Sequence, residues 1–483
     1  MELPVSLVMA DLQSLAEAIR TRAVSCVEVM SAYLDQIEEF NPKINAIVAL
    51  QPRDVLLREA GGRDAEIARG QYRGWMHGLP WAVKDLAVTK GIRTTFGSPL
   101  FKDYIPTEDG LMVSRLRKAG VVIVGKTNVP EFGCGSQTYN TVYGVTGNAY
   151  DPTKTAGGSS GGAASAIALR MLPAADGSDM AGSLRNPAAF NNIYGLRPSF
   201  GRVPLGPTDD VFLQNLVYEG PLGRTPRDVA MLLSAQAGYD PRSPLSITQD
   251  MASFTAPLDR DFKGARLGWV GDCSGELPIE PEVLEVCRSA LASFEAIGCI
   301  VEDIPLGFST ERLWKSWLAL RSVWAAGHLI DTYKDPAQRP LIKPEIQWEI
   351  ETALGVSGID VYNAGVVRSE FYLHVLKLFE TYDYLLAPTA QVFPFDKTTH
   401  WPTEICGRKT DAYTRWMETA IIWSLAGGPA ISVPAGFGKS GLPMGLQIIG
   451  RNHAEFAVFQ LAHAYHEATR WSEEVLPPLL REV

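Results

Sequence analysis

Residues 157–185 read GGSSGGAASAIALRMLPAADGSDMAGSLR, the most distinctive stretch of this 483-residue chain. A serine loop, GGSSGG at 157–162, precedes a short helix-like segment, and a second small-residue turn, DMAGSLR, follows at 179–185. An ordered segment of this composition usually holds its backbone against a ligand. The stretch therefore predicts a binding or catalytic site.

The sequence on both sides of this stretch alternates between strand-like and helix-like segments. Helical periodicity occurs at 9–38, 111–120, 281–296 and 456–469, and the segment 308–382 is helical and rich in aromatic residues. The strand-like segments are 78–88, 121–128, 265–272, 299–306, 384–389, 430–437 and 445–450. Such alternation predicts an α/β fold with a mostly parallel sheet covered on both faces.

Composition narrows the class of protein. Apolar residues make up 46% and charged residues 20% of the chain, which excludes a disordered or fibrous protein. The 44 basic and 54 acidic residues give a net charge of −10, so no nucleic-acid partner is expected. The length allows roughly three domains or one large α/β unit.

Cysteine usage and hydropathy indicate the compartment. The six cysteines are scattered and form no CxxC pair, which fits a reducing environment. The N-terminal residues do not resemble a signal peptide, and no apolar run approaches the ~20 residues of a membrane span. We therefore expect a cytoplasmic protein with no membrane partner.

Two motif matches point to other chemistries. GVVIVGKT at 120–127 fits a phosphate-binding loop, but its four middle residues read as a buried strand and leave no loop for a phosphate. GGSSG at 157–161 fits a nucleophile elbow, but the preceding DPTKTA is not strand-like. No HExxH occurs, and His463 and His466 lack a third ligand nearby, so neither metal nor cofactor is predicted.

The serines therefore need a base other than histidine. A serine hydroxyl is a poor nucleophile until a base takes its proton. Lys84 lies in the apolar context PWAVKDLAV, and burial there would lower its pKa. The alternative is a lysine that reaches solvent or pairs with Asp85.

Three motifs together resemble a known family. VKD (83–85), GGSSGG (157–162) and DMAGSLR (179–185) stand in the order and spacing of the amidase signature family of Ser–Ser–Lys hydrolases. The resemblance covers nearly the whole chain and implies a single large α/β domain, with a central twisted mixed β-sheet covered by helices on both faces. Within it we distinguish N-terminal helices (1–60), catalytic core motifs (61–230), a substrate-specificity segment (308–382) and closing strands and helices (383–483).

The resemblance assigns the reacting groups. Ser183 is similar to the nucleophile, Ser159 to the bridging serine, and Lys84 to the terminal base. The peptide bond between Gly158 and Ser159 is cis in the family. Proton transfer would run from Ser183 through Ser159 to Lys84 and return to the leaving amine.

The turn at 179–185 would stabilise the oxyanion through backbone N–H groups. The expected donors are Met180, Ala181, Gly182 and Ser183. The family usually has Gly-Gly before the nucleophile, and Ala181 is tolerable there only if its φ stays negative. Asp179 and Arg185 are interpreted as a supporting ion pair, and a substrate carboxylate bound by Arg185 is the alternative.

Substrate-binding residues follow from the same resemblance: Gly133, Cys134, Gly135 and Ser160. The aromatic and apolar weighting of 209–224 and 308–382 favours neutral, aryl or hydrophobic amides over a small zwitterion. The alternatives are a carbamate hydrolase and a glutaminase component that hands ammonia to a partner. A homo-oligomer is a further possibility.

The aromatic rings of 308–382 have two interpretations. They could belong to the core, or they could form a cover over Ser183 that sets substrate preference. Trp317, Trp324 and Tyr372 are the rings on which we test this.

Overall fold

An eight-stranded mixed sheet lies at the centre of the chain, for which a computed structural model describes residues 6–213, 215–249 and 251–481. In spatial order its strands are β10 (Ile300–Asp303), β9 (Arg266–Trp269), β11 (Tyr384–Pro388), β15 (Pro443–Ile449), β14 (Ala430–Phe437), β7 (Tyr194–Arg197), β8 (Tyr218–Gly223) and β6 (Ala174–Asp179). Within this sheet β9 pairs in parallel with β10 and β11, and the other neighbouring strands pair antiparallel.

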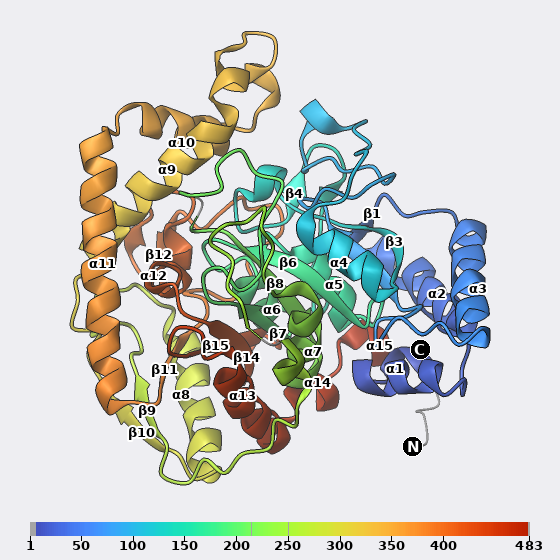
Figure 1. Ribbon diagram of the computed structural model, residues 1–483. Coiled ribbons are helices and arrows are strands. Elements are labelled where there is room, and N and C mark those ends of the chain that lie inside the picture. Colours follow the sequence, from blue (N-terminus) through green and yellow to red (C-terminus); the bar gives the residue numbers. More distant parts are fainter. Residues whose placement is uncertain (1–5, 214, 250, 482–483) are drawn as a thin grey trace.

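The mostly parallel sheet predicted from strand–helix alternation is wrong. β14 and β15 are separated only by residues 438–442 and form an antiparallel hairpin. A parallel partner would need a crossover of a dozen or more residues. The single domain with a mixed sheet, which the family resemblance implies, is the arrangement found (Figure 1).

Helices flank this sheet. α6 (Arg185–Phe190) and α8 (Pro281–Ala296) pack against β14 and β15, and α7 (Pro226–Gln236) packs against β8. The other helices around the sheet are α5 (Gly161–Ala168), α12 (Glu418–Ala426), α13 (Glu455–Thr469), α14 (Trp471–Glu474) and α15 (Pro478–Arg481). The strands β14 and β15 are buried along almost their whole length, as expected for strands covered by helices.

A small second sheet brings Lys84 to the large one. Its strands are β1 (Ile47–Val48), β3 (Val122–Thr127) and β2 (Pro80–Lys84), in that order. β2 contacts β6, the edge strand of the large sheet, so the end of β2 lies beside the end of β6. The helices α1 (Leu12–Arg20), α2 (Cys26–Ile44), α3 (Arg53–Ala68) and α4 (Leu111–Ala119) belong to the same half of the chain.

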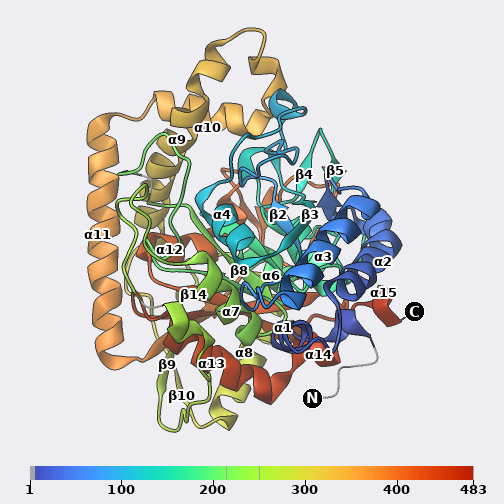
Figure 2. The same cartoon turned by 45° about the vertical axis from the view of Figure 1, so that its right-hand side comes forward.

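The helical character predicted for 308–382 is found. The segment forms α9 (Thr310–Lys334), α10 (Pro344–Leu354) and α11 (Gly358–Thr381), on the opposite side of the molecule from α2 and α3 in both views (Figures 1 and 2). Two short hairpins, β4 (Tyr139–Asn140) with β5 (Gly144–Val145) and β12 (Glu404–Ile405) with β13 (Arg408–Lys409), complete the strands. Within the described residues, no helix is apolar over a length sufficient to cross a membrane.

Candidate active site

Lys84 is buried at the end of β2 and points at three serines. Its Nζ lies 2.8 Å from Ser159 Oγ, 2.8 Å from Ser160 Oγ and 3.0 Å from Ser178 Oγ. Burial lowers the pKa of Lys84 to about 7, although the carboxyl groups of Asp179, Asp176 and Glu219 act in the opposite direction. The amine is therefore largely unprotonated just above neutral pH.

The alternative partner of Lys84, Asp85, is engaged elsewhere. Its carboxylate accepts hydrogen bonds from the backbone N–H and the hydroxyl of Thr95. Within the described residues Lys84 has no ion pair and is only 1% exposed. The amine therefore neither reaches solvent nor pairs with its sequence neighbour.

The serine loop is shaped by its glycines. The Gly158–Ser159 peptide bond is cis, as it is in the family that the sequence resembles. A Cβ on Gly158 would lie 2.8 Å from the backbone of Ser136, and one on Gly162 would lie 2.4 Å from the backbone of Asn128. Only glycine fits such close backbone approaches, which explains the two Gly-Gly pairs around the serines.

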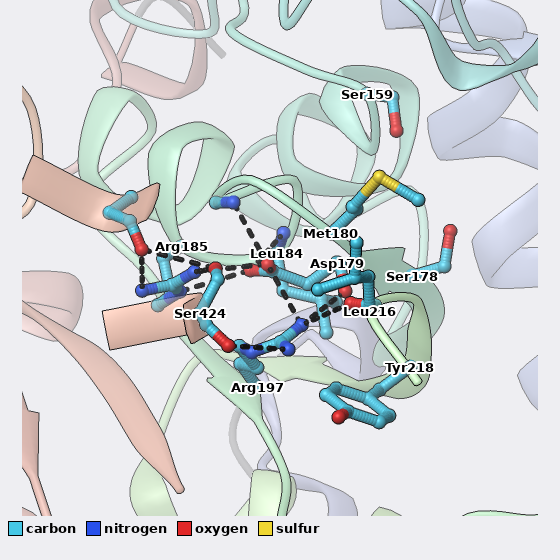
Figure 3. A network of polar contacts seen from close by, with 12 residues as sticks. Ser159, Ser178, Asp179, Met180, Leu184, Arg185, Arg197, Leu216, Tyr218 and Ser424 are labelled. Atoms are coloured by element: carbon cyan, nitrogen blue, oxygen red, sulfur yellow. Dashed lines mark hydrogen bonds and ion pairs between the residues drawn. The ribbon is translucent and has the colours of Figure 1, made fainter. Parts of the chain in front are cut away.

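A buried ion pair supports the turn after β6. Asp179 accepts hydrogen bonds of 3.0 Å from both Nε and Nη2 of Arg185, and Arg197 Nη1 lies 3.5 Å from Asp179 Oδ1 (Figure 3). Burial alone would raise the pKa of Asp179, but the two guanidinium groups hold it well below its usual range. The remaining donors of Arg185 bond to Ser424, Gln447 and Ala420. No nitrogen of Arg185 is left for a substrate carboxylate, so the alternative role for Arg185 is not supported.

The same carboxylate changes the expected set of oxyanion donors. The backbone N–H of Gly182 donates to Asp179 Oδ1 at 2.8 Å and is therefore occupied. The N–H groups of Met180, Ala181 and Ser183 donate no hydrogen bond within the described part of the chain. Ala181 is not among the residues with positive φ, which meets the condition set for its methyl group.

Ser183 lies at the end of this turn and is 6% exposed. Its backbone carbonyl accepts a hydrogen bond of 3.2 Å from Ser160 N–H, which ties the two serine loops together. For residues 6–213, 215–249 and 251–481, no hydrogen bond links the hydroxyls of Ser183 and Ser159. The structure thus brings Lys84 and Ser159 into direct contact, while the Ser183 hydroxyl has no hydrogen-bond partner among the described residues.

A cavity of about 580 Å³ opens beside Lys84. Its polar end holds Lys84, Asp176, Ser178 and Glu219, and its wall carries Leu86, Leu205 and Leu329. Five aromatic rings complete the wall: Phe96, Phe101, Tyr104, Phe132 and Trp324. Such an apolar wall around a few polar groups is typical of a small-molecule site.

Three of the four residues predicted to bind substrate lie at the cavity, at Lys84 or at Ser159, and the fourth does not. Cys134 lines the cavity, and Ser160 contacts Lys84. Gly133 lies against Ser159, since a Cβ on it would be 3.5 Å from the Ser159 hydroxyl. Gly135 is not part of the cavity lining and lies beside Lys343.

Most of the aromatic wall was not anticipated. Phe96, Phe101 and Tyr104 come from TTFGSPLFKDY at 94–104, where three rings fall within eleven residues after a predicted strand. This local density of rings is the sequence signal from which this part of the cavity wall could have been predicted. In the segment 308–382, Trp324 lines the cavity, whereas Trp317 is a fully buried core residue and Tyr372 lies outside the lining.

Arg321 of α9 joins the specificity segment to the serine turn. Its guanidinium group bonds to Glu349 at 3.0 Å and lies 2.6 Å from the sulfur of Met180 and 3.0 Å from that of Cys134. Burial would lower the pKa of Arg321, but Glu349 raises it above the usual value, so the guanidinium stays charged. α9 is therefore fixed against the turn that carries Ser183.

Comparison with known proteins shows to which family the chain belongs. The family described as Amidase matches residues 28–459. The chain is 34% identical to an acylamidase of Rhodococcus erythropolis over 95% of both chains. It is 33% identical to a component of the glutamyl-tRNA(Gln) amidotransferase of Thermosynechococcus vestitus, over 96% of this chain and 99% of that one.

The solved structures agree with the sequence relatives. A bacterial aryl acylamidase of the amidase signature family superimposes with a TM-score of 0.89 at 29% identity, covering 96% of this chain and 97% of that one. Three observations thus converge: the order of the three motifs, the mixed sheet and the buried lysine against three serines. The chain belongs to the amidase signature family and is an amide-hydrolysing enzyme.

Proposed function

We propose that this enzyme hydrolyses neutral aryl or hydrophobic amides through a seryl acyl-enzyme on Ser183. The observation that carries the proposal is Lys84, which lines a cavity walled by five aromatic rings and whose Nζ lies 2.8 Å from Ser159 Oγ. The contact supplies a base, and the wall supplies the preference for apolar groups.

In the proposed reaction Ser183 Oγ attacks the amide carbon while its proton passes to Ser159, whose own proton passes to Lys84. The N–H groups of Met180, Ala181 and Ser183, which donate no hydrogen bond within the described residues, are the candidate donors for the oxyanion. Lys84 then returns the proton through Ser159 to the leaving nitrogen, and the C–N bond breaks. Water then attacks the carbonyl carbon of the resulting ester while its proton passes through Ser159 to Lys84. The ester C–O bond breaks as Lys84 returns that proton through Ser159 to Ser183 Oγ, and the carboxylic acid is released.

The cavity favours an uncharged substrate over glutamine. Within the described residues its lining contains no arginine, and the nearby Arg185 has all its donors occupied. The α-carboxylate of glutamine therefore lacks a guanidinium partner. The glutaminase alternative is favoured only by the relatives that belong to glutamyl-tRNA(Gln) amidotransferases. A carbamate hydrolase uses the same groups and stays the first alternative.

An activity panel on the isolated protein tests the proposal. Anilides, aliphatic amides, carbamates and glutamine are compared by kcat/KM, with Ser183→Ala as the control for contaminating activity. We expect anilides and other aryl amides to be the best substrates. A preference for glutamine over every anilide would contradict the proposed substrate class, and turnover retained in Ser183→Ala would contradict the mechanism.

A further inference from the structure

Glu219 differs from the other acidic residues of the cavity. Asp176 accepts a hydrogen bond of 3.0 Å from the backbone N–H of Lys84, and Asp209 lies 3.5 Å from His328 Nδ1. The Oε2 atom of Glu219 is buried and has no hydrogen-bond partner among residues 6–213, 215–249 and 251–481. Buried polar groups are nearly always hydrogen-bonded, so an unpaired one beside a cavity requires an explanation.

The strand register directs Glu219 toward the reacting groups. Glu219 on β8 lies directly opposite Ser178 on β6. Residues that face each other across two antiparallel strands project their side chains from the same side of the sheet. Ser178 Oγ lies 3.0 Å from Lys84 Nζ, so Glu219 points to the same end of the cavity as the amine.

The carboxyl group of Glu219 can both donate and accept. Burial and the neighbouring Asp176 raise the pKa of Glu219 to about 8, although Lys84 acts in the opposite direction. At neutral pH the group is therefore mostly protonated. A protonated carboxyl has one O–H donor and acceptor capacity on its oxygens.

We propose that Glu219 is a specificity-determining residue, whose carboxyl group binds an uncharged polar group, such as a hydroxyl, amide or ureido group, on an otherwise apolar amide substrate. This inference rests on the proposed function and narrows its substrate class. The preferred substrate carries two polar groups, the reacting amide and a second one that satisfies Glu219, within an aromatic or aliphatic frame.

Charged groups fit this position less well. A substrate carboxylate would lose its hydration in a largely apolar cavity that also holds the Asp176 side chain, which is unfavourable. A substrate ammonium would gain an ion pair only after Glu219 had lost its proton inside a largely apolar cavity, which is unfavourable. A neutral group can form a hydrogen bond with the Glu219 carboxyl without either cost.

The test uses matched substrate pairs. The three ring isomers of hydroxyacetanilide are compared with the corresponding methylacetanilides, in which a methyl group of similar size replaces the hydroxyl. The ratio of kcat/KM for the hydroxyl over the methyl member is measured in wild type, Glu219→Gln and Glu219→Leu. Thr332→Val, which removes a hydroxyl from another part of the lining, is the control. Thermal melting verifies that each variant is folded.

For at least one isomer the wild-type ratio should favour the hydroxyl, and Glu219→Leu should lower it on the order of 10-fold to 100-fold. Glu219→Gln keeps a donor and an acceptor and should stay near the wild-type ratio. As the pH rises through about 8, the wild-type ratio should change because Glu219 becomes a carboxylate that only accepts hydrogen bonds, while the ratio of Glu219→Gln stays constant.

Each contrary result has a distinct meaning. If wild type hydrolyses neither member of any pair, the proposed function fails. If it hydrolyses both and Glu219→Leu leaves every ratio unchanged, or lowers both rates by the same factor, only the inference about Glu219 is overturned. The inference about Glu219 is also overturned if Thr332→Val lowers the ratio as much as Glu219→Leu does. It is overturned as well if wild type prefers an aminomethyl-substituted acetanilide and Glu219→Gln loses that preference.

Discussion

At the scale of single residues, the environment of Lys84 determines what the site can do. A lysine in water is a cation, but the amine of Lys84 is enclosed by serine hydroxyls and apolar neighbours that favour the neutral form. The sequence indicated a neutral amine because Lys84 lies within an apolar strand. It could not show that Asp85, the next residue, turns toward Thr95 instead.

Replacing Lys84 with Ala is expected to lower kcat by about 100-fold to 10,000-fold, because Ser159 then has no base. In wild type, kcat/KM should rise as the pH increases through about 7, since only the unprotonated amine accepts a proton. Measurements of kcat and kcat/KM from pH 5 to 9, for wild type and Lys84→Ala, test both the loss of activity and the pH dependence. Replacement of His453, His463 or His466 should have far less effect, and a histidine variant that loses activity while Lys84→Ala keeps it would refute the base assignment.

Ser183 should be the residue that becomes acylated. Its hydroxyl is free of hydrogen bonds within the described residues and stands next to unoccupied backbone N–H groups. A fluorophosphonate probe is expected to label Ser183, as peptide mapping by mass spectrometry would show, and Ser183→Ala should not be labelled. Label found on Ser159 in wild type would instead favour Ser159 as the nucleophile.

At the scale of elements, α9 performs two tasks, one in each half of its length. Trp314 and Trp317 are buried in the main core, whereas Trp324 and His328 line the cavity. From the sequence, all these rings share one helical, apolar segment, and periodicity alone could not separate core from cavity. The difference depends on which part of α9 meets the loop at 94–104, a contact between segments more than two hundred residues apart.

The two tryptophans of α9 should therefore respond differently to truncation. Trp324→Ala is expected to change the kcat/KM ratio between anilides and acetamide by about 1–3 kcal/mol in transition-state free energy. Trp317→Ala should leave that ratio unchanged and lower the free energy of unfolding by about 3–5 kcal/mol. Steady-state kinetics and urea denaturation measure the two effects. The opposite assignment of effects would mean that Trp324 is core and Trp317 contacts substrate.

At the scale of the whole molecule, the mixed sheet depends on the last hundred residues. β11, β15 and β14 come from 384–449 and lie together between β9 and β7. The sequence predicted these strands and the two-sided helical cover, but not their order, because antiparallel pairing depends on contacts that local patterns do not record. Formation of a homo-oligomer stays a prediction.

A chain ending at residue 382 should fail to fold. Without β11, β15 and β14, the pair β9–β10 loses its connection to β7, β8 and β6, and long strand edges are exposed. We expect aggregation or the loss of a cooperative thermal transition, measured by circular dichroism and size-exclusion chromatography. A soluble 1–382 chain with a cooperative melt and fluorophosphonate-labelled Ser183 would show that the N-terminal part is an independent unit.

The separation of the α9 cavity wall from the catalytic residues has a consequence for protein engineering. Trp324, Ala325, His328, Leu329 and Thr332 lie within nine consecutive positions of α9 and all border the cavity, while Lys84 and its three serines come from other elements. A library that varies these five codons would reshape the wall and leave the proton-transfer groups unaltered. During evolution, substitutions in this one short stretch of the gene would change which substrates the enzyme accepts, while its catalytic residues stay the same.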